Sequence, residues 1–259
     1  MNVEMMIGTY YRDFPWLKYC LRSIDKFCAG FAAITVQVPD RDYAAAVELV
    51  AAHCGSKARV VDGGEEWPGR GMLWHMNAAV HFDQICRPDT DFIAHVDADC
   101  VFAEPVTPDR YFVNGRPLLR YEPYASLSIG HPEIQNWQTF TQGCLPFPVV
   151  NETMRCYPFV YHRGLYRVTR ELIEQAVQQP VPTYLKSLQN TFPWGFTEFN
   201  TLGSVAMHQF SDQYQFLNPA VELNVSTGIQ HYWSHGGITP EAVQKMRALG
   251  LECAHQDSW

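Results

Sequence analysis

Two aspartates one residue apart follow an apolar run in the stretch DFIAHVDADCVF, which spans residues 91–102. Apolar residues on both sides of Asp97 and Asp99 would make uncompensated carboxylates costly, so the pair favours a cationic partner. Two other pairs have the same spacing, Asp40–Asp42 and Asp89–Asp91. The first opens a predicted helix and the second precedes a predicted strand, where carboxylates serve as caps and turn formers. Asp97 and Asp99 are therefore the candidate metal ligands, with a plain strand end as the alternative.

Two enzyme chemistries place an aspartate pair at the end of a strand. In phosphatases of the haloacid-dehalogenase type, the first aspartate attacks phosphorus and the second acts as acid and base. The stretch VDADCV has neither Thr nor Gly after the pair, and no acidic pair with a preceding lysine follows it. In nucleotide-sugar transfer the pair binds Mn²⁺ or Mg²⁺, which clamps the diphosphate and stabilises its departure. The sequence favours this second chemistry and leaves a metal-dependent phosphohydrolase as the weaker alternative.

Three segments together resemble the metal-dependent glycosyltransferases of the GT-A fold. They are TYYRD after the first predicted strand, HVDADCVF, and the late IQHYWSHGG. Bacterial lipooligosaccharide galactosyltransferases of this kind carry Ile-x-His-Tyr-x-Gly followed by Lys-Pro-Trp, and the histidine completes their metal site. Ile229, His231 and Tyr232 match this motif. The resemblance implies that His231 binds the metal together with Asp97 and Asp99.

The chain departs from the motif after Tyr232, where Trp233, Ser234 and His235 stand and the Lys-Pro-Trp segment is missing. The diphosphate therefore lacks the lysine that the resemblance implies, and His235 or Arg70 would have to take its place. An arginine after Pro-Gly can reach a phosphate with charge-assisted hydrogen bonds, although a solvated turn is the alternative for Arg70. His235 is also the second choice as metal ligand, because the H-x-x-x-H spacing would present both histidines on a helix.

The resemblance also implies roles for residues near the ends of other predicted elements. It places the nucleotide base and ribose on Thr9, Tyr10 and Arg12, and it sets Asp62 against the base. It brings Asn77 near the donor sugar and the phosphates. Helix capping and ordinary surface turns are the alternatives for these residues.

Glu198 lies in the stretch PWGFTEFNTLGSVA, where Thr197 is the predicted cap of a helix that starts at Glu198. A carboxylate at this position would lie at the positive end of the helix. The resemblance implies an acidic residue on the acceptor side of the cleft. Glu198 would deprotonate the acceptor hydroxyl if the transfer inverts the anomeric centre, and would position the sugar if it retains it. Trp137 and Trp194 are candidate sugar platforms, with core packing as the alternative.

Strands and helices alternate over the first hundred residues. Strands are predicted at residues 3–8, 32–38, 58–61 and 91–97, and helices at 15–27, 41–54 and 72–85. The short links predict an α/β fold with a mainly parallel sheet flanked by helices, Rossmann-like and, by resemblance, GT-A-like. The carboxyl ends of parallel strands lie at one edge of a sheet, so Thr9–Asp13, Asp62 and Asp97–Asp99 should line that edge.

The pattern changes after residue 103, where proline, glycine and aromatic residues become frequent. Helices are predicted only around residues 169–178, 197–209 and 240–249, and a strand before the first of these directs His162 and Arg163 toward the cleft. We expect a single GT-A-type domain over residues 1–259. Residues 1–103 would form its nucleotide-sugar-binding half and residues 104–259 a loop-rich acceptor and catalytic half.

Composition limits the partners. The net charge of −8 with five lysines disfavours DNA as an acceptor, although an extruded base would need only a local arginine patch and an aromatic pocket. The expected donor is a nucleotide diphosphate sugar, with UDP-sugar favoured by the resemblance. The expected acceptor is a hydroxyl of a glycan, a lipid-linked saccharide or a modified nucleobase. A non-catalytic protein that binds sugar nucleotides or glycans is a further alternative.

The eight cysteines have no C-x-x-C spacing, which predicts free, buried thiols in a reducing compartment. The N-terminal residues lack the basic and apolar regions of a signal peptide, and no apolar run reaches 18 residues. These features predict a soluble protein of the cytoplasm.

Overall fold

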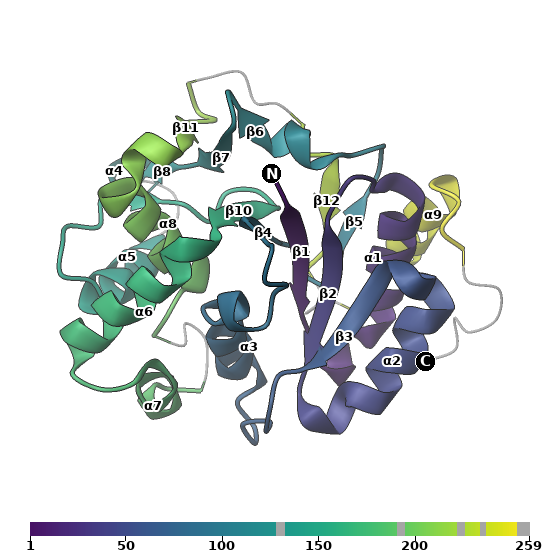
Figure 1. The fold of residues 1–259 in the computed structure, drawn as a ribbon, viewed down its shortest axis with the longest axis horizontal. Coiled ribbons are helices and arrows are strands. Elements are labelled where there is room, and N and C mark those ends of the chain that lie inside the picture. The colour runs from purple at the N-terminus through teal and green to yellow at the C-terminus, as the bar shows by residue number, and fades with distance from the viewer. Residues whose placement is uncertain (128–132, 191–194, 222–225, 234–236, 253–259) are drawn as a thin grey trace.

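A five-stranded sheet forms the centre of the computed structural model, which describes residues 1–127, 133–190, 195–221, 226–233 and 237–252 (Figure 1). The strand order is β10-β4-β1-β2-β3. These strands are β1 (Val3–Gly8), β2 (Ala33–Val38), β3 (Ala58–Asp62), β4 (Phe92–His95) and β10 (Phe159–His162). The first four run parallel, and β10 at the edge runs antiparallel to β4. The predicted α/β class with a mainly parallel sheet is therefore confirmed.

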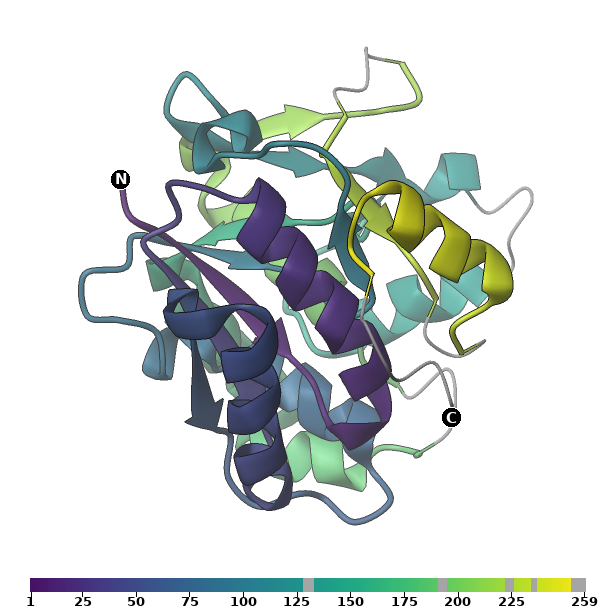
Figure 2. The same cartoon turned by 90° about the vertical axis from the view of Figure 1, so that its right-hand side faces the viewer.

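Helices cover both faces of this sheet, and alternate residues of β1 show the division. Met5 and Ile7 pack with α1 (Phe14–Phe27) and α2 (Tyr43–His53). Met6 packs on the other side with α3 (Gly71–Ala79), α6 (Arg163–Val177) and α8 (Glu198–Gln209). Successive side chains of a strand point to opposite faces, so the apolar run of β1 serves two cores. Figure 2 shows α1 beside α2 on one side, with α9 (Pro240–Ala248) next to α1.

Short strands and further helices build the rest of the molecule. β5 (Cys100–Phe102) pairs antiparallel with β12 (Ile229–His231), and β8 (Glu122–Pro123) pairs with β9 (Asn151–Glu152). A three-stranded sheet has the order β11-β7-β6, from β6 (Phe112–Val113), β7 (Arg116–Arg120) and β11 (Gln215–Leu217). The remaining helices are α4 (Tyr124–Leu127), α5 (Glu133–Gly143) and α7 (Val181–Ser187).

Three expectations about helices are wrong. The helix expected around residues 169–178 begins earlier, at Arg163. The helix predicted over residues 72–85 ends at Ala79, and Phe82–Gln84 form a separate 3₁₀ turn. Nδ1 of His81 lies 2.8 Å from Asn77 O. The His81 ring therefore bonds to one of the last carbonyls of α3, which a backbone amide would bond to if the helix continued. In the second half, α5 and α7 were not expected, because α5 is rich in polar residues and α7 is only seven residues long with a proline near its start.

Glu4 is a charged residue near the start of the buried strand β1, and it is 0% exposed. Its carboxylate accepts hydrogen bonds from the hydroxyls of Thr35 and Thr90 at 2.6 Å each, and from Arg87 N at 2.8 Å. Arg59 Nη2 lies 3.1 Å from it. Burial raises the pKa of Glu4, but these hydrogen bonds outweigh it and hold the pKa below its usual value. The residue is therefore a structural anion that ties β1 to β2, β3 and the start of β4.

The cysteines of the described ranges all carry free thiols, as predicted, and Cys253 lies outside those ranges. Within the same ranges, no helix combines the length and the apolar character that crossing a membrane requires.

Candidate metal and active site

The loop between β4 and β5 carries the aspartate pair to the edge of the sheet where the parallel strands end. Asp97 and Asp99 follow the last residue of β4, and a hydrogen bond from Cys100 N to Asp97 O (3.0 Å) closes the turn. β12 then pairs with β5 in a register that sets His231 opposite Cys100. A further hydrogen bond from Tyr232 N to Asp99 O (2.9 Å) extends the ladder into this turn. The strand pairing thus carries a late segment of the chain to the aspartates.

Asp99 and His231 face each other across this ladder. The Nε2 atom of His231 lies 3.2 Å from Asp99 Oδ1, although more than a hundred residues separate the two in the sequence. Burial lowers the pKa of His231, but the hydrogen bond to Asp99 and the charges of Asp99 and Asp97 raise it by more. The Cys100 sulfur joins them, and ligand atoms of the three residues lie within 4.8 Å of one another. Asp97 is not part of this compact set.

Asp97 is held by two side chains from other elements. Its Oδ2 accepts a hydrogen bond from the hydroxyl of Tyr157, and its Oδ1 lies 3.8 Å from Nε2 of His75 on α3. Burial and the neighbouring charge of Asp99 raise the pKa of Asp97 to about 7. The charges of Asp99 and His231 both affect the pKa of Asp97, while its own oxygens face Tyr157 before β10 and His75 on α3.

Glu198 begins α8 on the same side of the sheet and is buried. Burial raises its pKa to about 7, the charge of His75 lowers it, and that of Asp97 raises it. Thr197 is the cap residue of α8, as predicted, but its side chain makes no capping hydrogen bond. Its hydroxyl lies 2.9 Å from that of Thr141 on α5, because both hydroxyls are buried and satisfy each other. The charges of His75 and Asp97 thus both reach Glu198 and act on its pKa in opposite directions.

The donor set decides which metal ion fits. Asp97, Asp99 and His231 offer carboxylate oxygens and an imidazole nitrogen, which suit Mn²⁺ or Mg²⁺ when substrate oxygens complete the shell. Cys100 is 0% exposed, and burial together with Asp97 and Asp99 raises the pKa of its thiol well above the usual range. Without a metal the thiol therefore stays protonated. The carboxylates and the imidazole are the donors that suit an ion preferring oxygen and nitrogen.

The residues predicted to contact the nucleotide lie at the same edge of the sheet. Thr9 follows β1, is 1% exposed, and its Oγ1 has no hydrogen-bond partner among the described residues. The ring of Tyr10 lies over Gly71 at the start of α3, where an added Cβ would meet it at 3.6 Å. Arg12 is exposed and donates to Tyr11 OH (3.1 Å).

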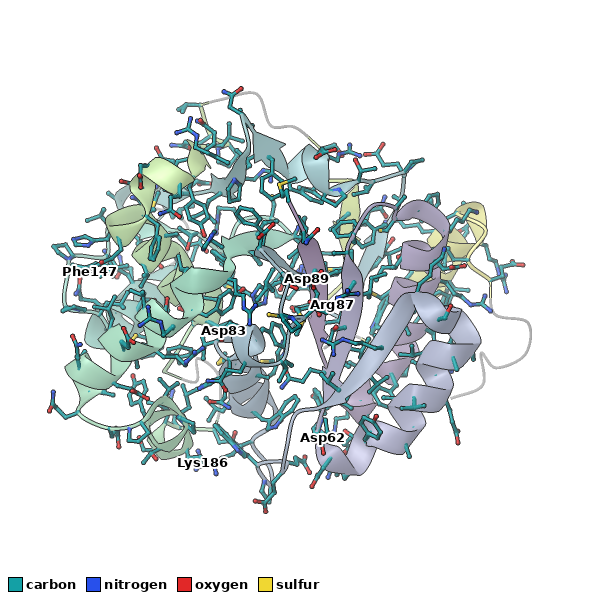
Figure 3. All side chains as sticks on the ribbon, in the orientation of Figure 1. Asp62, Asp83, Arg87, Asp89, Phe147 and Lys186 are labelled. Atoms are coloured by element: carbon teal, nitrogen blue, oxygen red, sulfur yellow. The ribbon has the colours of Figure 1, made fainter. Side chains whose placement is uncertain are left out.

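Asp62, at the end of β3, is exposed, and its Oδ1 accepts a hydrogen bond from Gly64 N at 2.7 Å. This is an ordinary turn contact. Figure 3 shows Asp62 at the tip of β3, away from Arg87 and Asp89, which precede β4.

The remaining predicted site residues make other contacts or fall outside the described ranges. Arg70 donates from Nη1 to Leu188 O (2.8 Å), which ties the turn before α3 to the end of α7. Asn77 is on α3, with a buried Oδ1 that lacks a hydrogen-bond partner in the described part of the chain. Trp137 packs against the larger core cluster, in line with the core-packing alternative. His235 and Trp194 lie outside the described residues.

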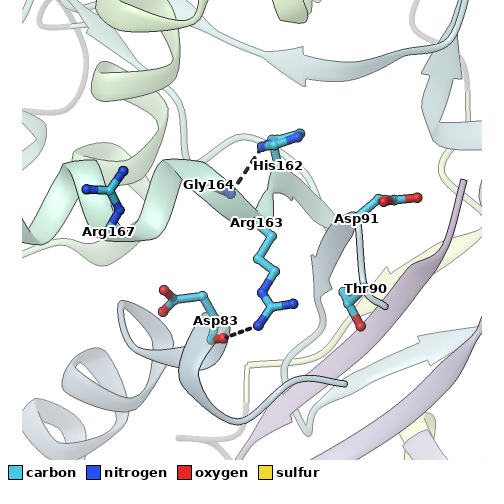
Figure 4. Close-up of a pocket in the computed structure, with 7 residues that line it drawn as sticks. All are labelled: Asp83, Thr90, Asp91, His162, Arg163, Gly164 and Arg167. Atoms are coloured by element: carbon cyan, nitrogen blue, oxygen red, sulfur yellow. Dashed lines mark hydrogen bonds between the residues drawn. The ribbon is translucent and has the colours of Figure 1, made fainter. Parts of the chain in front are cut away.

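His162 and Arg163 do not face the aspartates. β10 is antiparallel, so its carboxyl end lies at the amino end of β4, where His162 pairs with Phe92. There they line an open pocket of about 340 Å³ with Asp83 and Asp91 (Figure 4). The Arg163 guanidinium donates to backbone carbonyls around this pocket, including Pro88 O at 2.8 Å.

Sequence reasoning missed two residues of the site, Tyr157 and His75. The antiparallel direction of β10 places its first residue, Phe159, beside His95 at the end of β4, so Tyr157 just before it reaches Asp97. The His75 ring can lie close to the end of β1 because residue 8 is glycine. An added Cβ at that position would lie 3.0 Å from the ring. The sequence carried no local signal for either contact, because each depends on how two distant elements pack.

Comparison with known proteins adds no relative: no protein-family model matches this chain, and no curated protein does either.

Proposed function

We propose that this protein is a metal-dependent glycosyltransferase of the GT-A type, which moves a sugar from a nucleotide diphosphate donor to an acceptor hydroxyl. One observation carries the proposal. Asp99 and His231 lie 3.2 Å apart at the carboxyl edge of a mainly parallel sheet, where ligands of open α/β sheets bind. The motif resemblance required this pairing, and neither a capping aspartate nor a core histidine would require it.

Asp99 and His231 would hold Mn²⁺ or Mg²⁺, with Asp97 supplying a further oxygen. A bound ion of this kind would neutralise the departing diphosphate. Thr9 and Tyr10 lie at the end of the central strand and would face the nucleoside, with UDP-sugar as the favoured donor. Residues 1–103 would then be the donor half and residues 104–259 the acceptor half.

Glu198 would act on the acceptor. A general base works best when its pKa is near the operating pH, and burial raises the pKa of Glu198 to about 7. It would accept the proton of the attacking hydroxyl of a glycan or another acceptor as the bond to the sugar forms. The buried environment favours the neutral form after this transfer, so the proton stays on the carboxyl until it can leave to solvent.

A thermal-shift screen tests the proposal. The protein is heated with Mn²⁺ or Mg²⁺ and, in turn, UDP, GDP, CMP and TDP, and one nucleotide should stabilise it only when a metal is present. Asp99→Asn should abolish this stabilisation. Asp91→Asn is the matched control, because Asp91 belongs to another pair of the same spacing and accepts from Asn2 N at 2.8 Å.

Stabilisation by none of the four nucleotides with either metal would refute the transferase. Release of phosphate from simple phosphomonoesters would instead identify a phosphohydrolase. Metal-dependent nucleotide binding without slow hydrolysis of any donor would identify a silent binder.

A further inference from the structure

The ring of Tyr157 touches three parts of the site that come from three separate segments of the chain. Its hydroxyl donates a hydrogen bond to Asp97 Oδ2 after β4. Its ring meets that of His231 on β12 edge to face, with centroids 5.0 Å apart and an interplanar angle of 64°. It also meets the ring of Phe199, the residue after Glu198, with centroids 5.9 Å apart at 87°. One side chain therefore lies between both metal-site segments and the start of α8.

We infer that Tyr157 is a positioning residue, which orients the Asp97 carboxylate and the His231 imidazole for a divalent cation and aligns them with Glu198. This inference rests on the proposed metal site. Side chains that hold metal ligands in place commonly change metal affinity 10- to 100-fold when they are removed, because the free ligands must then be ordered on binding.

The hydroxyl distinguishes this role from plain core packing. The Phe159 and Tyr157 rings have centroids 4.7 Å apart, and the Phe199 ring also contacts that of Tyr157 edge to face. Phenylalanine at position 157 would therefore fill the same space. Only the hydroxyl reaches Asp97. Without it, Asp97 Oδ2 would lose the neutral donor that fixes the carboxylate plane, and the longer contact of Oδ1 with His75, at 3.8 Å, would hold the carboxylate less firmly.

The ring adds a second constraint. Edge-to-face aromatic pairs have a preferred geometry, so the Tyr157 ring limits how far the His231 imidazole can turn about its own side-chain bonds. Asp99 holds the same imidazole from the other side through Nε2. Removing the ring should therefore loosen His231 in addition to Asp97, and should weaken metal binding more than removal of the hydroxyl alone.

The test measures Mn²⁺ affinity directly, from the paramagnetic resonance signal of free Mn²⁺ during a titration of the full chain. Tyr157→Phe should weaken binding by about 10- to 100-fold, and Tyr157→Leu should weaken it further. Tyr111→Phe is the matched control. Tyr111 is also buried, at 3% exposed, and its hydroxyl donates to Thr227 O at 2.9 Å, so this variant loses a comparable hydrogen bond away from Asp97 and should keep wild-type affinity.

A second comparison separates positioning from general loss of structure. In an Asp97→Asn background the hydroxyl of Tyr157 no longer orients a carboxylate, so adding Tyr157→Phe should change Mn²⁺ affinity by less than about threefold, as expected for residues that act as one unit. If Tyr157→Leu does not fold, Tyr157→Phe alone and in the Asp97→Asn background still tests whether Tyr157 positions the metal ligands.

The outcomes distinguish the inference from the proposed function. Wild-type affinity in Tyr157→Phe, with binding lost in Asp99→Asn, would overturn the positioning role and leave the metal site standing. Equal weakening in Tyr157→Phe and Tyr111→Phe would also overturn it, since a general loss of stability would then explain both. Failure of the wild-type chain to bind any divalent ion would overturn the inference and the metal-dependent function together.

Discussion

Replacing Glu198 by glutamine should stabilise the protein, and by an amount that grows with pH. Burial raises the pKa of Glu198 from 4.5 to about 7 in the folded chain. A difference of this size corresponds to about 3 kcal/mol, since a tenfold change in proton affinity is worth about 1.4 kcal/mol. Below the unfolded pKa both states are protonated and nothing is lost. As pH rises from 4.5 to about 7 the unfolded chain releases its proton first, so the stability of the folded state falls.

Glutamine has a similar shape and cannot ionise, so it escapes this penalty. The advantage of Glu198→Gln over the wild type should be under about 1 kcal/mol at about pH 5 and about 3 kcal/mol at about pH 8. Urea unfolding at several pH values without added metal measures it. Glu241→Gln is the control, because Glu241 also lies in the first turn of a helix but is exposed, with a pKa that hydrogen bonds lower. If the gain in unfolding free energy from Glu198→Gln does not change with pH, or shrinks as pH rises, the raised pKa of Glu198 is refuted.

Three other expectations can be checked by unfolding or binding. Mn²⁺ at about a hundred times its dissociation constant should stabilise the wild type by about 2.7 kcal/mol, and Asp99→Asn or His231→Ala should lose most of this gain; equal stabilisation of either variant in a thermal scan would contradict the site. Gly203→Ala should cost about 1 to 3 kcal/mol, because the added Cβ would lie 2.1 Å from Thr153 Oγ1, and an unchanged urea midpoint would show that the helix shifts freely. Glu4→Gln should lower the free energy of unfolding by about 2 to 4 kcal/mol at about pH 7. Because hydrogen bonds lower the pKa of Glu4, this loss should shrink as pH falls through that lowered pKa. A loss that does not change with pH would argue against an ionised Glu4.

Much of the sheet could be predicted from sequence because it rests on local signals. β1 and β2 are nearly continuous apolar runs, and their observed bounds match the expected ones to within a residue. The place of β10 could not be predicted in this way. A short apolar strand carries no mark of its direction, and the antiparallel pairing of β10 decides both that Tyr157 reaches Asp97 and that His162 does not.

In the candidate site, too, the residues specified by a sequence motif could be predicted and the others could not. Asp99 and His231 were found from motifs that specify residue types at fixed spacing, and the structure brings their side chains to 3.2 Å. Their metal and its chemistry stay predictions. Asp62 was proposed from its place after a strand and from the resemblance, with no motif of its own, and it forms a turn with Gly64. Arg70 was proposed as a substitute for the missing lysine because it follows Pro-Gly, and it donates to the carbonyl of Leu188.

The charges of the site explain why a cation and protons are alternatives there. Three carboxyls belong to this site: those of Asp99 and Glu198 are buried, and that of Asp97 is partly buried, with 25% of its side chain exposed. His75 and His231 are the imidazoles beside them. Ionising all three acids in a medium of low dielectric would be costly without compensation. Two of the acids, Asp97 and Glu198, accordingly have pKa values raised to about 7, so near neutrality the metal-free protein limits its negative charge by holding protons. A divalent ion at Asp99 and His231 would supply the compensation instead and would lower the pKa of Asp97 first, since the charges of that pair act on Asp97. Glu198 would be affected less, and a proton-accepting carboxyl beside a fully ionised metal site would suit the acceptor activation that we propose.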